Sequence, residues 1–278
     1  MNVDRIDIDF FKGRAYEMAG VFDEANKVYE RVISRLNKIQ GTREEVERRV
    51  NEYLPTRDTV HLRLAKTNLE QRRYPESYKY LSKITGKSKL NSEEQIERVA
   101  VAAKVYEQRG DAKTAIGYLK ALIKNWEDKE EQLTPAYLKM AELNMEIGKY
   151  IQAEVAADDT ISLVDNDELR DDYKNYLIDA MKIKAESLQK QGRNLAAVEA
   201  YMNLLNRFEN ERPMESIRYK AGEILYGLKD LQGAKKVWSN LDPEKSEFYK
   251  QLADEKMKSA EWESTYNKYI NRIPAMQR

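Results

Sequence analysis

The chain lacks cysteine and has a single histidine, and these two shortages narrow its chemistry. Without Cys it forms no disulfide framework, no iron–sulfur cluster and no thiolate zinc site. His61 has no second histidine to complete a metal site, so we interpret it as an ordinary histidine on the surface or between helices. The sequence also has no Gly-x-Ser-x-Gly elbow and no phosphate-binding loop. We therefore expect no metal, no cofactor and no enzymatic activity.

Proline, glycine and long apolar runs are also scarce. The 278 residues include 6 Pro and 11 Gly, and the mean hydropathy is −0.80. No apolar run approaches the roughly 20 residues that a membrane span needs, and the first residues show no signal-peptide pattern. The sequence predicts no membrane insertion and leaves cytoplasm and periplasm as alternatives. Its abundance of Glu, Lys, Arg, Ala and Leu, with no strand pattern, predicts an all-α fold.

Charge is balanced in total but uneven along the chain. There are 48 basic and 48 acidic residues. Residues 31–90 carry a net charge of +8, and residues 141–180 carry −8. This separation affects how partners approach the molecule rather than how it folds.

A short sequence motif recurs along the chain: a turn residue, an aromatic or small residue, Ala, and then a bulky residue. The first copy reads Gly20-Val-Phe22-Asp-Glu-Ala25, with Tyr29 four residues later. The six turn residues are Gly20, Arg72, Gly110, Gly148, Gly192 and Lys229. A degenerate seventh copy consists of Trp262, Thr265 and Tyr269. Recurrence in one frame predicts stacked structural repeats.

A second position falls into the same frame, seven residues before each turn residue. Small residues stand there: Gly13, Ala65, Ala103, Ala141, Ala185, Gly222 and Ala253. We expect one helix to end at each turn residue, where Gly adopts the left-handed conformation. The small residues then lie where two helices cross. One pair cannot bury its apolar face alone, so the pairs must stack.

This pattern resembles the tetratricopeptide repeat (TPR) family over nearly the whole chain. The resemblance implies a right-handed superhelical solenoid of about seven antiparallel helix pairs, forming a single elongated domain over 1–278. The Ala-phase spacings of 52, 38, 38, 44 and 37 residues exceed the family's usual spacing of about 34. The expected repeats span approximately 7–40, 57–86, 92–127, 134–165, 167–210, 213–242 and 244–273.

The two widest spacings and several helix starts can be placed. Thr42 with Glu45 forms a capping box before apolar residues at helical spacing, which predicts an inserted helix near 42–54. Residues 167–191 read as a lengthened first helix. Other predicted starts are Ser92 with Gln95, Thr134-Pro135 and Asp242-Pro243.

In the TPR architecture the first helix of each pair lines a concave groove, so the resemblance implies which positions face a partner. The row beside the small crossing residue reads Arg14, Lys66, Lys104, Glu142, Glu186 and Glu223. The row before it reads Phe10, Leu62, Ala100, Leu138, Lys182 and Tyr219. The row after it reads Glu17, Leu69, Glu107, Met145, Gln189 and Tyr226. We expect an apolar floor with a positive N-terminal half and a negative C-terminal half, suited to an extended or helical peptide.

One stretch allows a different partner. Basic residues alternate with tyrosines from Arg72 to Lys89, a pattern that can grip a phosphate chain and stack bases. Tyr74 is already the packing aromatic of its repeat, however, and the acidic region would repel a polyanion. We therefore expect no nucleic acid partner and interpret the stretch as a protein-docking patch or a solvated face.

The predicted function is a non-enzymatic scaffold that binds a partner peptide or protein in its groove within a multiprotein complex. The alternative is a regulator or sensor that binds a short peptide or an intramolecular tail. The widened repeats are similar to bacterial TPR proteins of the cell envelope, including outer-membrane assembly and motility components. The terminal pair leaves Trp262, Tyr266 and Tyr269 without a following repeat, which allows self-association, whereas Glu261 and Glu263 suit a solvated cap.

Overall fold

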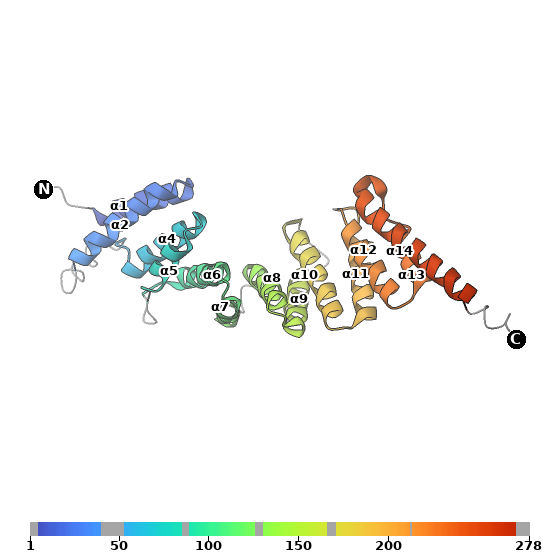
Figure 1. The fold of residues 1–278 in the computed structure, drawn as a ribbon. Helices are drawn as coiled ribbons and strands as arrows, with labels where there is room; N and C mark the ends of the chain where they lie inside the picture. The colour runs from blue at the N-terminus through green and yellow to red at the C-terminus, as the bar shows by residue number, and fades with distance from the viewer. Residues whose placement is uncertain are drawn as a thin grey trace. The chain divides into compact units, whose positions relative to one another are not determined.

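A computed structural model describes residues 5–39, 53–84, 89–125, 130–165, 171–211 and 213–270 (Figure 1). These residues form 13 α-helices and no strand. In the first half the helices are α1 (Ile6–Met18), α2 (Phe22–Lys38), α4 (Arg57–Glu70), α5 (Tyr74–Leu81), α6 (Ser92–Gln108) and α7 (Ala112–Asn125). The remainder are α8 (Glu130–Glu146), α9 (Tyr150–Val164), α10 (Asp171–Lys190), α11 (Asn194–Phe208), α12 (Glu215–Gly227), α13 (Leu231–Trp238) and α14 (Pro243–Ile270). The predicted all-α class is confirmed.

The chain divides into two compact units, Met1–Ala136 and Tyr137–Arg278, with the boundary inside α8. Buried clusters around Tyr29 and Leu62 lie in the first unit, and the cluster around Tyr201 lies in the second. The sequence predicts one domain over 1–278, whereas the structure presents two units with cores of their own. No helix within the described ranges is long and apolar enough to cross a membrane.

The repeat turns form as the sequence predicts. All six turn residues have a positive φ, between 58° at Arg72 and 77° at Gly192. The same two backbone bonds close each turn: at the first, Val21 N–H donates to the Tyr16 carbonyl (2.9 Å) and Gly20 N–H to that of Glu17 (3.0 Å). This Schellman geometry pairs carbonyls that a helix end otherwise leaves unbonded.

Arg72 and Lys229 occupy this left-handed conformation without being glycine, with φ of 58° and 66°. A left-handed residue with a Cβ costs roughly 1–2 kcal/mol. We expect Arg72→Gly and Lys229→Gly each to stabilise their unit by about 1 kcal/mol, and Gly110→Ala to destabilise it by a similar amount. Urea denaturation followed by circular dichroism measures the shift. Destabilisation by either glycine variant would contradict the assignment.

The crossing positions explain two further glycines. A Cβ on Gly13 would lie 2.5 Å from Cε1 of Tyr29, and one on Gly222 would lie 2.3 Å from Nε1 of Trp238. Where the bulky position carries Leu, as at Leu81 and Leu119, the crossing residue is Ala instead. At these two crossings the absence of a Cβ makes room for the ring, whereas Ala185 is combined with Tyr201 without such an overlap being needed.

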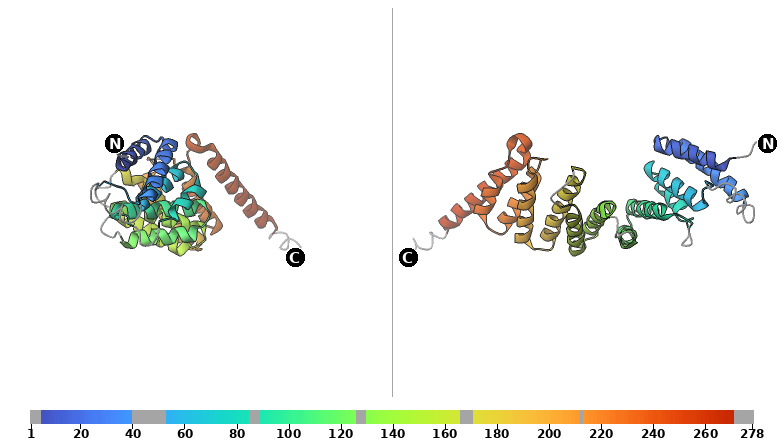
Figure 2. Two further views of the ribbon diagram at one scale, coloured as in Figure 1. Left: turned by 90° about the vertical axis from the view of Figure 1, so that its left-hand side faces the viewer. Right: turned by 180° about the vertical axis from the view of Figure 1, so that it is seen from behind.

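The last expected repeat differs from the prediction. Instead of a helix pair over 244–273, two helical stretches of α14 meet at a kink at Ser246 (φ −161°, ψ 95°), and the helix then runs unbroken past the expected turn at Ala260 to Ile270 (Figure 2). At that turn position Ala260 stands where the other copies have Gly, Arg or Lys. Ala and its neighbours Lys258 and Glu261 favour helix continuation.

Two predicted helix starts differ from the structure, and a third prediction falls mostly outside the residues that the structure describes. The capping box of α6 uses Asn91 and Glu94, one residue before the predicted Ser92 and Gln95, and the Glu94 side chain closes it by accepting from Asn91 N–H. Helix α8 begins at Glu130 and passes through Pro135 rather than beginning there. The helix predicted near 42–54 lies outside the described residues except for its last two, which are not helical. The start at Asp242-Pro243 is confirmed.

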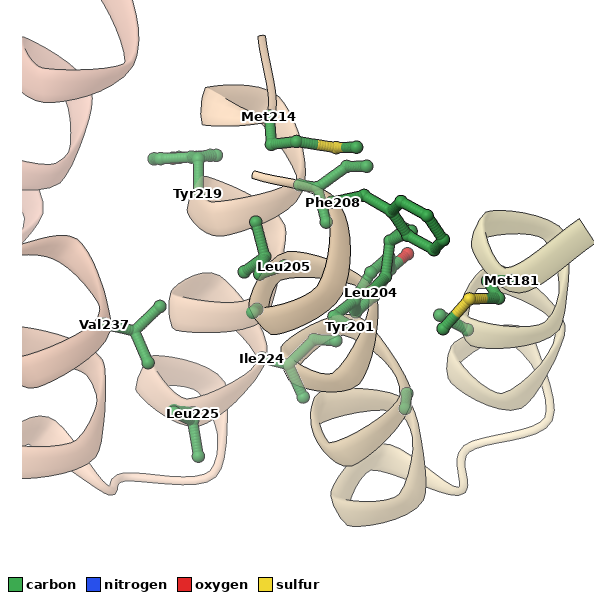
Figure 3. Packing of buried hydrophobic residues seen from close by; sticks show 14 of the residues in the cluster. Met181, Tyr201, Leu204, Leu205, Phe208, Met214, Tyr219, Ile224, Leu225 and Val237 are labelled. Carbon is green, nitrogen blue, oxygen red and sulfur yellow. The ribbon is translucent and has the colours of Figure 1, made fainter. Parts of the chain in front are cut away.

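The core of the second unit shows how bulky residues fill the space between pairs. Tyr201 and Leu204 are fully buried on α11, and Ile224 of α12 points toward them (Figure 3). Met181 of α10 lies on the other side of the same cluster. The cluster therefore holds α10 and α12 on either side of α11.

Candidate functional site

In the first unit, the predicted groove positions surround a buried ionic network. Arg63 of α4 is 5% exposed and pairs with Glu97 of α6 and, at 3.4 Å from Nη1 to Oε1, with Glu17 of α1. Lys66 Nζ lies 2.7 Å from Oε1 of Glu97 and 3.5 Å from Oε1 of Glu17. The hydroxyl of Tyr29 donates to Oε2 of Glu17 at 2.6 Å. The network therefore joins three successive first helices.

The electrostatic environment holds this network in its charged form. Burial raises the pKa of Glu97, but the hydrogen bond from Lys66 and the charge of Arg63 outweigh burial, so the pKa stays below its usual value. Burial, together with the hydrogen bond to Glu17, raises the pKa of Tyr29. Tyr29 therefore remains a hydroxyl donor at neutral pH.

Of the three predicted basic residues, Lys104 is exposed and Arg14 is half-buried. Lys66 is engaged by the two carboxylates of the network, which reduces the positive charge it offers to a partner. The structure thus places the basic row on the first helices α1, α4 and α6, with its central member neutralised.

In the second unit, each predicted acidic residue meets a lysine. The Nζ–carboxylate distances are 2.5 Å for Lys139 to Glu142, 2.6 Å for Lys220 to Glu186 and 2.8 Å for Lys256 to Glu223. The last two pairs join α10 to α12 and α12 to α14. The negative charge expected on this row is therefore offset locally, while the glutamates keep side-chain exposures of 24–42%.

The predicted apolar floor is mostly core. Leu62 is fully buried, and Leu69, Leu138 and Tyr219 are 5–8% exposed. Their positions on the inner edge of each first helix bring them against the paired second helix, which removes them from contact with a partner. In these two rows Ala100 is exposed, and the partly exposed members are Phe10, Glu107, Met145, Lys182, Gln189 and Tyr226.

Sequence reasoning missed the partners of the charged row, namely Arg63, Glu97, Lys220 and Lys256. Spacing was the available signal: Arg63 and Glu97 are 34 residues apart, as are Glu186 and Lys220. The corresponding crossing residues are 38 and 37 residues apart, so each pair joins positions about one helical turn out of register on adjacent first helices, and opposite charges at that spacing meet.

His61 is a residue of α4, and its ring stacks on the ring of Tyr80 of α5 with centroids 6.2 Å apart. Burial lowers the pKa of His61 to about 4, helped by the charges of Lys83 and Arg57 and opposed by Asp58. Its Nδ1 is buried and makes no hydrogen bond. Among the described residues no cluster of three metal-ligating side chains forms, and this histidine packs between helices as predicted.

The lowered pKa of His61 gives the first unit an acid-sensitive component. The pKa of this histidine is about 6.5 in the unfolded chain and lower in the folded one, so the unfolded chain binds the proton more tightly. Above about pH 6.5 the residue does not affect the free energy of unfolding, and as pH falls from there toward about 4 it progressively lowers that free energy. We expect a loss of about 2–3 kcal/mol between pH 7 and pH 4 from this residue. In His61→Phe the loss should be smaller by that amount, measured by urea denaturation across the pH range. An unchanged pH profile would contradict the assignment.

The outer side of the second unit carries a cavity of about 370 Å³ between α9, α10 and α11. Met181 and Leu188 contribute to its apolar lining. Two ion pairs link α9 to α11 beside it: Arg193 to Glu154 at 2.9 Å, and Arg207 to Asp165 at 2.5 Å. All four of these charged residues line the cavity, together with Lys184, Glu199 and Asn203.

No family model and no curated protein matches the sequence. Solved structures match the fold. The apo form of RapI is 11% identical, with a TM-score of 0.56 over 92% of this chain and 98% of that one. A signal transduction ATPase with numerous domains and a tetratricopeptide repeat sensor, from Pyrococcus horikoshii, is 12% identical, with a TM-score of 0.52 over 94% of this chain and 43% of that one. At these identities the likeness concerns the fold, and the cell-envelope resemblance stays a prediction. The helix pairs, their Schellman turns and these matches together establish that the chain has a tetratricopeptide-repeat fold.

Proposed function

We propose that this protein is a non-enzymatic interaction module that binds a peptide or protein segment across its first helices. The observation that carries the proposal is the surface of the second unit, where partly exposed Met145, Gln189 and Tyr226 stand beside the glutamate–lysine pairs. Apolar and aromatic anchors within a polar rim are the composition that favours specific protein contacts.

The ion pairs refine the expected electrostatics of this surface. Because Lys220 and Lys256 neutralise Glu186 and Glu223, the row presents alternating charges rather than one sign. A partner segment with charges of both signs matches such a row, and charge pairs set its orientation and association rate more than its affinity. Exposed Met145 and Tyr226 supply the larger share of binding energy.

The first experiment selects peptides against the full chain from a display library and measures their affinity. We expect Tyr226→Ala and Met145→Ala each to weaken binding about tenfold. The matched controls are Leu195→Ala and Ile151→Ala on the second helices, where the parent side chains are 72% and 62% exposed. Binding that is lost in the controls but kept in the first pair would overturn the proposal.

A second experiment separates charge pattern from stability. The double variant Glu186→Lys with Lys220→Glu keeps the ion pair but inverts its direction, and so does Glu223→Lys with Lys256→Glu. We expect little change in the free energy of unfolding, about 1 kcal/mol or less, together with weaker and differently salt-dependent binding. Unchanged affinity and salt dependence in both swapped variants would show that the partner does not contact this row.

A further inference from the structure

The final helix exposes an aromatic stripe along one face. Every residue from 261 to 270 is exposed. The exposed fractions are 64% at Phe248, 67% at Trp262, 49% at Tyr266 and 66% at Tyr269. The rings of Trp262 and Tyr266 stack on each other, with centroids 5.2 Å apart and planes 10° apart. Four aromatic side chains on a single helix are thus left facing solvent.

The spacing of this stripe is that of a coiled-coil seam. Phe248, Trp262 and Tyr269 fall seven or fourteen residues apart, and Tyr266 takes the intermediate position of the same heptad. Glu255, also exposed, is a polar member of the row. A seven-residue apolar repeat with two positions per heptad faces another helix. Leu252 and Ser259 hold the position of Tyr266 in the two preceding heptads, and Leu252 packs against the second unit, so the uncovered apolar part of the seam is Trp262, Tyr266 and Tyr269, with Phe248 further back.

The exposed end of α14, residues 261–270, has little packing to stabilise it as a helix. Ala253 and Ala260 of α14 are buried, and Tyr249, Leu252 and Met257 pack partly buried against the core of the second unit, whereas residues 261 to 270 are all exposed. Isolated helices shorter than about 12–15 residues are barely stable in water, and Trp, Tyr, Thr and Asn are weak helix formers. The outer face of a terminal repeat is also normally polar. Covering the stripe would remove both problems.

We propose that α14 pairs in parallel with α14 of a second copy of this chain. Charge complementarity selects this occupant and this direction. In a parallel two-helix coiled coil, a flanking residue lies beside the partner residue five positions further on. Lys258 and Glu263 are five positions apart, flank the aromatic stripe and are both exposed. Within the described part of the chain neither makes an ion pair, so each is available to the second copy.

The area available implies a weak dimer. The exposed parts of the four aromatic side chains, each of about 200 Å² in total, amount to roughly 500 Å² per copy, or about 1,000 Å² for the pair. Specific interfaces below about 1,200 Å² belong to weak and transient complexes. Glu255 in the seam weakens the pair further. The dimer should therefore form reversibly at micromolar concentrations.

Sedimentation velocity of the full chain, from low to high micromolar concentration, tests association. We expect a concentration-dependent shift from monomer to dimer, and Trp262→Ala should weaken it at least about tenfold. Leu195→Ala, which removes an equally exposed side chain from α11, should leave association unchanged. Glu255→Leu should strengthen it. A monomer at all concentrations, or a dimer indifferent to Trp262→Ala, would overturn the proposal.

Charge variants test the direction of pairing. Lys258→Glu and Glu263→Lys should each dissociate the dimer, because every flanking contact then joins like charges. An equimolar mixture of the two variants should associate again, since each copy then meets the opposite charge at both contacts. Failure of the mixture to associate while the unmodified chain dimerises would exclude the parallel register. Glu142→Gln, a remote charge change, should have no effect.

Discussion

Trp238→Ala should lower the stability of the second unit by about 3–5 kcal/mol. The side chain is 2% exposed, and its ring stacks on that of Tyr219 with centroids 5.7 Å apart. Its Nε1 donates to the Tyr219 carbonyl at 3.0 Å. Truncation leaves a cavity and removes a second hydrogen bond from a carbonyl that still accepts within α12, so the loss comes mainly from packing. Hydrogen exchange at the amides of α12 and α13 measures it separately from the first unit.

Substitutions at Gly222, alone and combined with a smaller residue at position 238, provide the control for this prediction. Gly222→Ala alone should cost about 1–3 kcal/mol, because its Cβ would overlap the Trp238 ring. In the background of Trp238→Leu the same change should cost much less, since other repeats combine Ala with Leu, as at Ala103 and Leu119. Additive losses in the double variant would show that Gly222 is not fitted to Trp238.

Arg63→Met should destabilise the first unit by about 3–5 kcal/mol at neutral pH. Met keeps much of the side-chain volume but removes the buried cation shared by Glu17 and Glu97, which are left with the half-buried Lys66 alone. Removing one partner of a buried ion pair exposes the desolvation cost of the other. Arg73→Met is the matched control, because its ion pair with Asp23 (3.0 Å) is exposed on both sides and should contribute below about 1 kcal/mol.

The loss caused by Arg63→Met should shrink as pH falls. In the unmodified chain the pKa of Glu97 lies below its usual value, so the carboxylate stabilises the fold above about pH 4.3 and that contribution disappears on acidification. Without Arg63 the buried carboxylates favour protonation, and acid relieves their repulsion and desolvation. Urea denaturation at several pH values compares the two chains. A loss that is independent of pH would mean that packing, not charge, dominates at Arg63.

Much of the candidate surface could be located from sequence because the repeat frame fixes which side of a helix each position occupies. Arg14, Lys104 and Glu142 lie on first helices as that frame requires. The repeat frame does not, however, predict how deeply each side chain is buried. Leu62 and Tyr219 lie on the same side of their helices as these charged residues but are buried. Their burial depends on the distance between two packed helices, which the sequence of one helix does not determine.

The sequence by itself determined the first six helix pairs and their turns, because those depend on local properties: the left-handed conformation at residues such as Gly20 and small residues at a constant distance before each turn. Only the tertiary structure decided which charges are neutralised. The pairing of Arg63 with Glu97, or of Lys256 with Glu223, requires adjacent first helices to be placed within a few ångströms of each other. Composition counts charges along a chain, whereas electrostatic energy depends on their separation in space.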